Sequence, residues 1–542
     1  MRVLIIIPAR GGSKGIPRKN VRALAGKPLL QYSINNALNS SFQPDVYVSS
    51  EDDEILNLAA KLGANVHNRN LHLSGDAITL DEVIFSAYEE IMAAANKTYD
   101  LIVTLQPTSP LLKTASLDKA LQQMVDFPKV DTIISATNDT HLTWKKNEEG
   151  FYPNYTARVN RQYLEPVYKE TGGFLITRDT VISEAGRIGQ KVELFELPQK
   201  QSIDIDTFED WNLCDYHLNR KRIVFSVSGY PEIGLGHIYN TLILANEILD
   251  HEVIFFCDAK SALGYQIISQ HNYPCHLQEG DDLTAEVLKL SPDIVINDRL
   301  DSTVESMRPY KERDIQIINI EDLGAGTELA DLVFNAIYPE ETPLENHFSG
   351  PSYFCARDEF ILTKEKELQE QVSNVLISFG GVDPNNLTAK VLDSIYDICQ
   401  QRQITINVVA GLGYANYDTL NQYKDISVFK NISNISHYMQ VADIAFTSAG
   451  RTTYELALLG IPSIVMAQNS REMTHFFASE QYGFKNLGLG EEIDNAAVAD
   501  NFLALLDSLP TRMEMRKKMF AVDLRNGKKR VITHIKRLIQ SK

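Results

Sequence analysis

Short apolar runs alternate with amphipathic stretches along the first 220 residues. The apolar runs have the length of buried strands and occupy residues 3–7, 46–49, 101–105 and 132–135. The stretches between them have helical spacing and occupy residues 28–39, 53–62, 80–94 and 116–125. This alternation predicts a mainly parallel sheet covered by helices on both faces, which is a Rossmann-like α/β domain over residues 1–220.

The same pattern starts again at Lys221, after a helical stretch at 211–220 that joins the two parts. Strand-like runs follow at residues 222–228, 253–256, 294–296 and 315–320. After about Glu365 the pattern restarts, with runs at 375–379, 404–409, 444–447 and 463–466. We therefore expect two further Rossmann-like lobes, 221–365 and 366–542, with a cleft between them.

Composition and charge narrow the possible functions. The 542-residue chain has a formal net charge of −19, which argues against general binding of nucleic acid. An anionic substrate must therefore meet a locally basic site. No run of 18 apolar residues occurs, so we expect no membrane span and place the protein in the cytoplasm. The five cysteines are scattered without CxxC spacing, so neither a disulfide framework nor a zinc site is expected.

A glycine-rich, basic loop follows the first strand. From Ala9 to Asn20 it reads ARGGSKGIPRKN, with three glycines that let the backbone approach a ligand closely. Its cations, which suit a triphosphate, are Arg10, Lys14, Arg18 and Lys19. The loop is not a Walker A motif, because GxxxxGK[ST] is absent. The alternative is a solvated basic loop without a ligand.

Two more segments carry candidate chemistry. Residues 106–110, QPTSP, form a loop that two prolines make rigid, at the end of a strand where open α/β sheets bind ligands. In SIDIDT, alternation puts Asp204 and Asp206 on one face of an extended segment, where two carboxylates could hold Mg²⁺. The alternative for Asp206 or Thr207 is the cap of the following helix, and both roles could coexist.

With these motifs, residues 1–220 resemble the CMP-sialic acid synthetase family, which includes synthetases for legionaminic and pseudaminic acids. The resemblance implies transfer of CMP from CTP to a nine-carbon 2-keto acid sugar, release of pyrophosphate, Mg²⁺ on the two aspartates, and a homodimer. It implies that CTP is bound by Arg10, Gly11, Gly12, Ser13, Lys14, Lys19, Asn20 and Arg69. It implies that the sugar is bound by Gln106, Thr108, Ser109, Arg161, Gln162 and Lys169.

Within this resemblance Lys14 and Arg161 are the candidate catalytic residues, and no general base is evident. Lys169 stands where the family commonly has arginine, and Thr171-Gly172-Gly173 stands where Asn-Gly-Ala is common. These departures leave open which nonulosonic acid is activated.

The second half carries its own motifs after predicted strands. They are GLGHI at 234–238, SFGGVDP at 378–384, SAGRTTYELALLGIP at 448–462, and Gln468-Asn469. His237 could act as a base, or it could cap the glycine turn as a structural residue. Glu455 could accept hydrogen bonds from a ribose, or it could be a solvated helix residue.

Residues 221–542 resemble the UDP-sugar hydrolase of the pseudaminic acid pathway, a relative of GT-B glycosyltransferases. The resemblance implies that His237 activates water and that a UDP-diacetamido-trideoxyhexose is bound by Gly236, Gly380, Gly381, Ser448, Gly450, Glu455 and Asn469. Asn240 stands where the family usually has arginine, and Asn297-Asp298-Arg299-Leu300 stands where Asp-His-Tyr is frequent. The chain is thus predicted to be bifunctional, with a glycosyltransferase or a non-catalytic binding or oligomerisation module as alternatives for its second half.

Overall fold

The computed structural model describes residues 1–13, 15–75, 77–338, 340, 343–411, 413–430, 432 and 434–541. The chain divides into two compact units, Met1–Arg220 and Lys221–Lys542, and each is described by itself. Among the described residues, no helix is long and apolar enough to cross a membrane.

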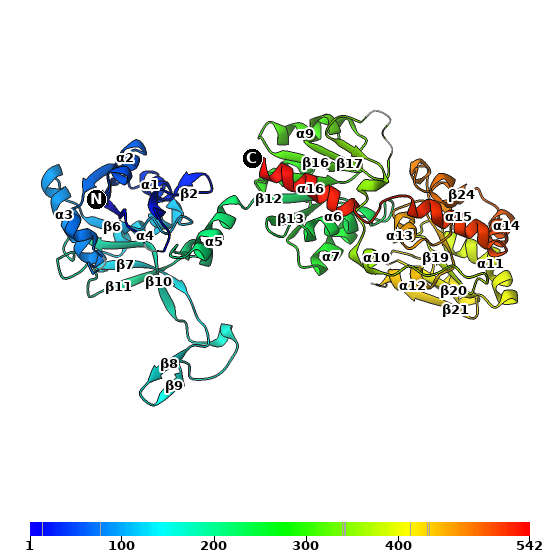
Figure 1. The fold of residues 1–542 in the computed structure, drawn as a ribbon, viewed down its shortest axis with the longest axis horizontal. Helices are drawn as coiled ribbons and strands as arrows, with labels where there is room; N and C mark the ends of the chain where they lie inside the picture. The colour runs from blue at the N-terminus through cyan, green and yellow to red at the C-terminus, as the bar shows by residue number, and fades with distance from the viewer. Residues whose placement is uncertain are drawn as a thin grey trace. The chain divides into compact units, whose positions relative to one another are not determined.

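The first unit is built on one seven-stranded sheet (Figure 1). In order across the sheet, the strands are β11 (Val192–Glu196), β7 (Thr132–Asn138), β10 (Tyr168–Arg178), β6 (Leu101–Leu105), β1 (Val3–Pro8), β4 (Asp45–Ser50) and β5 (Asn65–Asn68). Neighbouring strands are parallel except at β10, which is antiparallel to β6 and β7. The helices are α1 (Leu29–Leu38), α2 (Asp53–Lys61), α3 (Leu80–Ala95), α4 (Thr114–Asp126) and α5 (Phe208–Asn219). The predicted mainly parallel α/β sheet is confirmed.

Local chemistry explains where these helices begin. The Asp52 side chain accepts from Ile55 N–H at the start of α2. Thr79 and Glu82 form a reciprocal capping box at the start of α3. The central strand β1 is almost fully buried, because helices cover both faces of the sheet.

An arm between β7 and β10 was not predicted from the sequence. It carries the antiparallel hairpin of β8 (Trp144–Asn147) and β9 (Gly150–Pro153), which projects away from the sheet (Figure 1). Its large apolar side chains are unusually exposed, with 55% of Trp144, 72% of Phe151 and 73% of Tyr163 accessible. Exposed apolar side chains gathered on one projecting arm mark a surface suited to interaction.

The second unit contains two parallel sheets. In the first lobe, the strand order is β14 (Cys275–Leu277), β13 (Glu252–Cys257), β12 (Arg222–Val227), β15 (Ile294–Asp298), β16 (Gln316–Ile320), β17 (Leu332–Asn335) and β18 (His347–Ser349). In the second lobe, it is β21 (Ile426–Lys430), β20 (Thr405–Ala410), β19 (Asn374–Ser378), β22 (Ile444–Thr447), β23 (Ser463–Ala467) and β24 (Phe484–Leu489). The expected pair of Rossmann-like lobes is therefore present.

Helices cover the sheets of both lobes. In the first lobe they are α6 (Gly236–Asn246), α7 (Ala262–Gln270), α8 (Leu283–Lys289) and α9 (Val304–Lys311). The link between the lobes contains α10 (Asp358–Leu362). In the second lobe they are α11 (Leu387–Arg402), α12 (Ile435–Val441), α13 (Thr452–Leu459), α14 (Asn495–Leu506) and α15 (Leu509–Phe520).

The last helix, α16 (Gly527–Gln540), packs on the first lobe, whereas the sequence analysis assigned all of residues 366–542 to the second lobe. Its apolar face, with Val531, Ile535 and Ile539, joins the buried core of the first lobe around Ile223 and Phe225. In Figure 1 this red helix lies beside the green elements of the first lobe. The chain crosses back because this amphipathic helix buries its apolar face against the first sheet.

Candidate active sites

The glycine-rich loop of the first unit is held by acidic residues that follow β4. Gly11 N–H donates to Glu51 Oε1 at 2.7 Å. A Cβ at Gly11 would lie 2.4 Å from Asp52 Oδ2, so the loop needs glycine here to approach α2 closely. Arg18, in a left-handed conformation with φ 55°, pairs with Asp52 at 2.6 Å. Glu51 and Asp52 therefore hold the Gly11 amide and the Arg18 guanidinium of this loop, which form part of a candidate anion site.

Three other residues predicted to bind CTP are held by hydrogen bonds to backbone carbonyl groups. Lys19 Nζ donates to Ile205 O at 2.5 Å and lies 3.6 Å from Asp206 Oδ1. The buried Asn20 donates from Nδ2 to Arg10 O at 2.9 Å. Arg69 is also buried and donates to Ser49 O at 2.6 Å. Gly12 and Ser13 lie in the loop, a Cβ at Gly12 would meet open space, and Lys14 lies outside the described residues.

The QPTSP loop and the aspartate segment meet beside this loop. Ile205 N–H donates to Thr108 O at 2.9 Å, which joins the two segments. Three polar atoms there have no hydrogen-bond partner among the described residues although solvent does not reach them: Thr108 Oγ1, Ser109 Oγ and Asp204 Oδ1. Burial raises the pKa of Asp204; the neighbouring Thr108 hydroxyl acts in the opposite direction, and the charge of Asp206 adds to the effect of burial. Unpartnered buried polar atoms indicate a site that a ligand completes.

Thr207 takes the capping role at α5. Its side chain accepts from Asp210 N–H, and the Asp210 side chain accepts from Thr207 N–H. A complete capping box therefore forms without the Asp206 side chain. The Asp206 carboxylate keeps 77% of its surface exposed beside Lys19. Of the two alternatives for this segment, the cap falls on Thr207 and leaves Asp206 available to a ligand.

The remaining predicted sugar residues are more scattered. Gln106 lies in the QPTSP loop, where Ser33 donates to its backbone carbonyl at 3.0 Å. Arg161 and Gln162 lie on the exposed arm, and their side chains make no hydrogen bond or ion pair within the described part of the chain. Lys169 is exposed on β10. Within this one chain, the structure does not bring Arg161 and Gln162 into contact with the aspartate segment.

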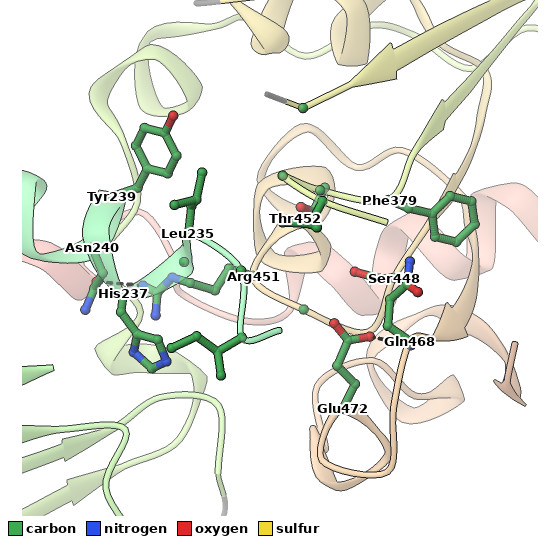
Figure 2. Close-up of a pocket in the computed structure, with 18 of the residues that line it drawn as sticks. Leu235, His237, Tyr239, Asn240, Phe379, Ser448, Arg451, Thr452, Gln468 and Glu472 are labelled. Carbon is green, nitrogen blue, oxygen red and sulfur yellow. Dashed lines mark hydrogen bonds between the residues drawn. The ribbon is translucent and has the colours of Figure 1, made fainter. Parts of the chain in front are cut away.

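A cleft of about 640 Å³ opens in the second unit. Its walls follow the carboxyl ends of strands in both lobes, where open α/β sheets bind ligands. It is lined by His237 together with every predicted UDP-sugar residue: Gly236, Gly380, Gly381, Ser448, Gly450, Glu455 and Asn469. The volume lies within the usual range for small-molecule sites, roughly 300–1,000 Å³. The cleft thus gathers motifs from both lobes (Figure 2).

His237 is held by a buried carboxylate. Its Nδ1 lies 2.6 Å from Asp298 Oδ1, and Asp298 is fully buried at the end of β15. Asn240, one turn further along α6, donates to Asp298 Oδ2 at 2.5 Å. With Nδ1–H donating to the carboxylate, Nε2 carries the lone pair and can accept a proton. This arrangement suits a general base and does not require His237 to cap the turn.

Glu455 is not a solvated helix residue. Arg357 donates to Glu455 Oε1 from Nε at 3.0 Å and from a terminal nitrogen at 2.9 Å. Burial raises the pKa of Glu455, whereas Arg357 acts in the opposite direction. Its place in the cleft wall is compatible with the expected ribose contact, and its contact with Arg357 fixes the orientation of the carboxylate.

A second buried carboxyl group, Glu321, lies in the cleft wall after β16. It is 3% exposed and has a left-handed backbone, with φ 53°. Its Oε2 accepts from Ile337 N–H at 3.1 Å. Burial raises the pKa of Glu321 to about 7, although the nearby Arg451 favours its ionised form. A strained, buried acid in a cleft is a frequent feature of functional sites.

We expect this acid to make stability depend on pH. The unfolded-state pKa of glutamate is about 4.3, so the folded state binds more protons between that pH and about 7. The free energy of unfolding therefore falls as pH rises from about 4.3 to about 7, and the contribution of the protonated group is lost above pH 7. Glu321→Gln should raise the melting temperature relative to wild type more at pH 8 than at pH 5, on the order of 3 °C.

Thermal melts of the full chain at both pH values measure this difference. Glu312→Gln, at an exposed position of the same lobe, is the matched control and should show no such pH dependence. Asp298, His237 and Arg451 also surround Glu321, so the Gln variant isolates the contribution of the carboxyl group. An equal shift at pH 5 and pH 8 would contradict the assignment.

Three cleft residues were missed by the sequence interpretation. Asp298 was seen only as part of a departure from a family pattern, yet it holds His237. Glu321 lies outside every motif, and Arg451 lies within SAGRTTYELALLGIP but was given no role. The sequence offered one sign of this cluster: His237 and Asn240 are three residues apart on one helix, so they share a face and can contact the same partner.

Comparisons with known proteins cover both units. A family model described as cytidylyltransferase matches residues 4–210. The pseudaminic acid cytidylyltransferase of Campylobacter jejuni is 35% identical over 222 residues, which are 39% of this chain and 93% of that protein. An uncharacterized protein of Methanocaldococcus jannaschii is 32% identical over 272 residues, or 46% of this chain, and the match spans only 56% of that relative.

A relative from Helicobacter pylori matches both units together. The Helicobacter pylori protein named pseudaminic acid cytidylyltransferase and UDP-2,4-diacetamido-2,4,6-trideoxy-beta-L-altropyranose hydrolase is 22% identical over 523 residues. That match covers 93% of this chain and 94% of the relative. Because the chain covers nearly all of the 35% identical Campylobacter protein, it belongs to the cytidylyltransferase family.

Proposed function

We propose that the chain is a bifunctional enzyme of nonulosonic acid biosynthesis. The first unit transfers CMP from CTP to a nine-carbon 2-keto acid sugar and releases pyrophosphate. The second unit hydrolyses a UDP-diacetamido-trideoxyhexose. The observation that carries the second activity is the His237–Asp298 pair, in which His237 lines the cleft together with every residue expected to bind the UDP-sugar.

In the first unit, we propose that CTP binds to the glycine-rich loop. The Glu51 carboxylate accepts the Gly11 N–H, a bond that a phosphate oxygen would make when CTP binds. Lys19 supplies positive charge beside the aspartate segment, and Arg10, Lys14 and Arg69 are proposed to complete the basic surroundings. Such cations offset the charge that develops on the phosphates.

The donor set around Asp204 fits a divalent cation. Asp204 Oδ1 is buried without a partner among the described residues, and Asp206 is exposed nearby. Carboxylate oxygens are ligands that Mg²⁺ prefers, and it completes its shell with phosphates and water. Mg²⁺ bound there would polarise the α-phosphate. Lys19, between Ile205 O and Asp206, would keep the aspartate segment near the triphosphate.

The acidic sugar is placed next to the QPTSP loop. Thr108 and Ser109 offer unpartnered hydroxyl groups for its own hydroxyls, and Gln106 lies beside them. Arg161, Gln162 and Lys169 are proposed to hold its carboxylate. Because Arg161 and Gln162 lie on the exposed arm, we propose that the arm packs on a second copy of the chain and that the enzyme is a homodimer.

In the second unit, water attacks the anomeric carbon of the UDP-sugar. His237 Nε2 takes a proton from the water as the new C–O bond forms. The bond from the anomeric carbon to the phosphate oxygen breaks, and its electron pair leaves with UDP. Asp298 orients the imidazole and stabilises the imidazolium that results. A sugar hydroxyl in place of water would make the same site a glycosyltransferase.

Two assays of the full chain test the proposal. Pyrophosphate release is measured with CTP, Mg²⁺ and a panel of sialic, legionaminic and pseudaminic acids. UDP release is measured from UDP-diacetamido-trideoxyhexose, with and without an added sugar acceptor. Pyrophosphate release that requires one of the acids, together with acceptor-independent UDP release, is the expected result. Failure of either release contradicts the corresponding half of the proposal.

The two units are expected to work separately. Each has its own sheet and buried core, and the division falls at Arg220 and Lys221. A fragment of residues 1–220 should be soluble and keep cytidylyltransferase activity within about threefold of the full chain, which is a small change in barrier height. The measurement is pyrophosphate release per mole of enzyme. A folded but inactive fragment would show that the first site needs the second unit.

A further inference from the structure

One arginine crosses the cleft between the two lobes of the second unit. Arg451 immediately precedes α13 in the second lobe, and its side chain extends to α6 of the first lobe (Figure 2). A terminal nitrogen donates to Asn240 Oδ1 at 2.7 Å. The other terminal nitrogen lies 3.5 Å from Glu321 Oε1. Both lobes therefore fix the position of one guanidinium group.

The surroundings of Arg451 are built to hold a charge in the cleft. Its guanidinium lies 4.7 Å from the centre of the Phe354 ring, and 18% of its side chain remains exposed. A Cβ at Gly236 would lie 3.3 Å from Arg451 Cδ, so the glycine turn leaves room for the arginine stem. The arginine and the glycine turn both line the cleft beside His237.

A continuous set of hydrogen bonds connects this arginine to the candidate base. Arg451 donates to the Asn240 side-chain oxygen, and the Asn240 side-chain nitrogen donates to Asp298 Oδ2. The other oxygen of Asp298 contacts His237 Nδ1. The amide of Asn240 is the link between the two lobes in this set, because it accepts on one side and donates on the other.

Building on the proposed hydrolysis, we propose that Arg451 binds the diphosphate of the nucleotide and that Asn240 couples this contact to the orientation of His237. A diphosphate that leaves with its electron pair gains negative charge, which a guanidinium in the cleft stabilises. Glu321 is a positioning residue, because it acts by holding Arg451. The second lobe thereby takes part in orienting a base that lies in the first lobe.

Binding of UDP to the full chain, measured by isothermal titration calorimetry, tests the first part. Arg451→Gln should weaken UDP binding about 10- to 100-fold, because it removes a charge-assisted contact. Arg402→Gln is the matched control, since Arg402 pairs with Asp507 on the surface of the same lobe, 47% exposed and outside the cleft. That control should bind UDP as wild type does.

Asn240→Ala tests the coupling. Because Glu321 still holds Arg451 in this variant, UDP affinity should stay within about threefold of wild type. The kcat for UDP release should fall at least about tenfold with little change in KM, as expected for loss of base orientation. Melting temperatures of all variants verify that the lobes remain folded. A purely structural role of Asn240 would change stability without this separation of kcat from KM.

The outcomes separate this inference from the proposed hydrolysis. If wild type binds UDP but releases none from the sugar, the hydrolase proposal fails, and the Arg451 assignment is still decided by the affinities. Equal UDP affinity of wild type and Arg451→Gln overturns the arginine assignment. An unchanged kcat in Asn240→Ala overturns the coupling, and no UDP binding by wild type overturns both proposals.

Discussion

Replacing His237 by alanine is expected to lower the rate of UDP release by about 10²- to 10⁴-fold, the usual contribution of a general base. His237 Nδ1 is fixed at 2.6 Å from Asp298, which leaves Nε2 as the proton acceptor. His237→Asn should have nearly the same effect, because an amide can form hydrogen bonds but cannot take the proton. UDP release from the diacetamido-trideoxyhexose by the full chain is the measurement.

Two controls make this result specific. Synthesis of the CMP-sugar should be unchanged in both variants, because its candidate residues belong to the first unit. His276→Ala, at an exposed position on β14, should retain wild-type UDP release. Release that depends on a sugar acceptor would identify a glycosyltransferase. UDP binding without any release would indicate a non-catalytic binding module.

Replacing Asp204 or Asp206 by asparagine is expected to lower CMP-sugar synthesis by on the order of 10²-fold or more, through loss of a metal ligand charge. The Asp204 carboxyl group is largely buried, so replacing it by a neutral amide of the same shape should not destabilise the fold. Asp206→Asn should also fold, since Thr207 caps α5. Pyrophosphate release is measured as Mg²⁺ is varied.

The matched control for the aspartates is Asp126→Asn, at an exposed position at the end of α4. It should keep wild-type activity and the same Mg²⁺ dependence. Near-normal kcat of both Asp204→Asn and Asp206→Asn at saturating Mg²⁺ would contradict the metal assignment. Restored activity at high Mg²⁺ alone would show that each aspartate contributes to affinity and not to the chemical step.

The local sequence pattern was enough to predict the central strands of all three sheets, the helices α1 to α5 and the glycine turns that follow the strands. Runs such as residues 3–7 and 444–447 lie within strands because a strand buried on both faces must be apolar throughout. The loops after such strands come together at one edge of a parallel sheet. The seven residues that the family resemblance assigned to the UDP-sugar follow such strands or begin the next helix, and they line one cleft.

Which distant residues meet could be seen only once the fold was known. His237 and Asp298 are 61 positions apart, and Asn240 and Arg451 are 211 apart, so their pairing depends on how strands and lobes are arranged. The packing of α16 on the first lobe was equally hidden in the sequence. Its amphipathic pattern shows that one face must be buried, but not which sheet buries it. Local periodicity determines which side chains are buried, whereas three-dimensional packing determines their partners.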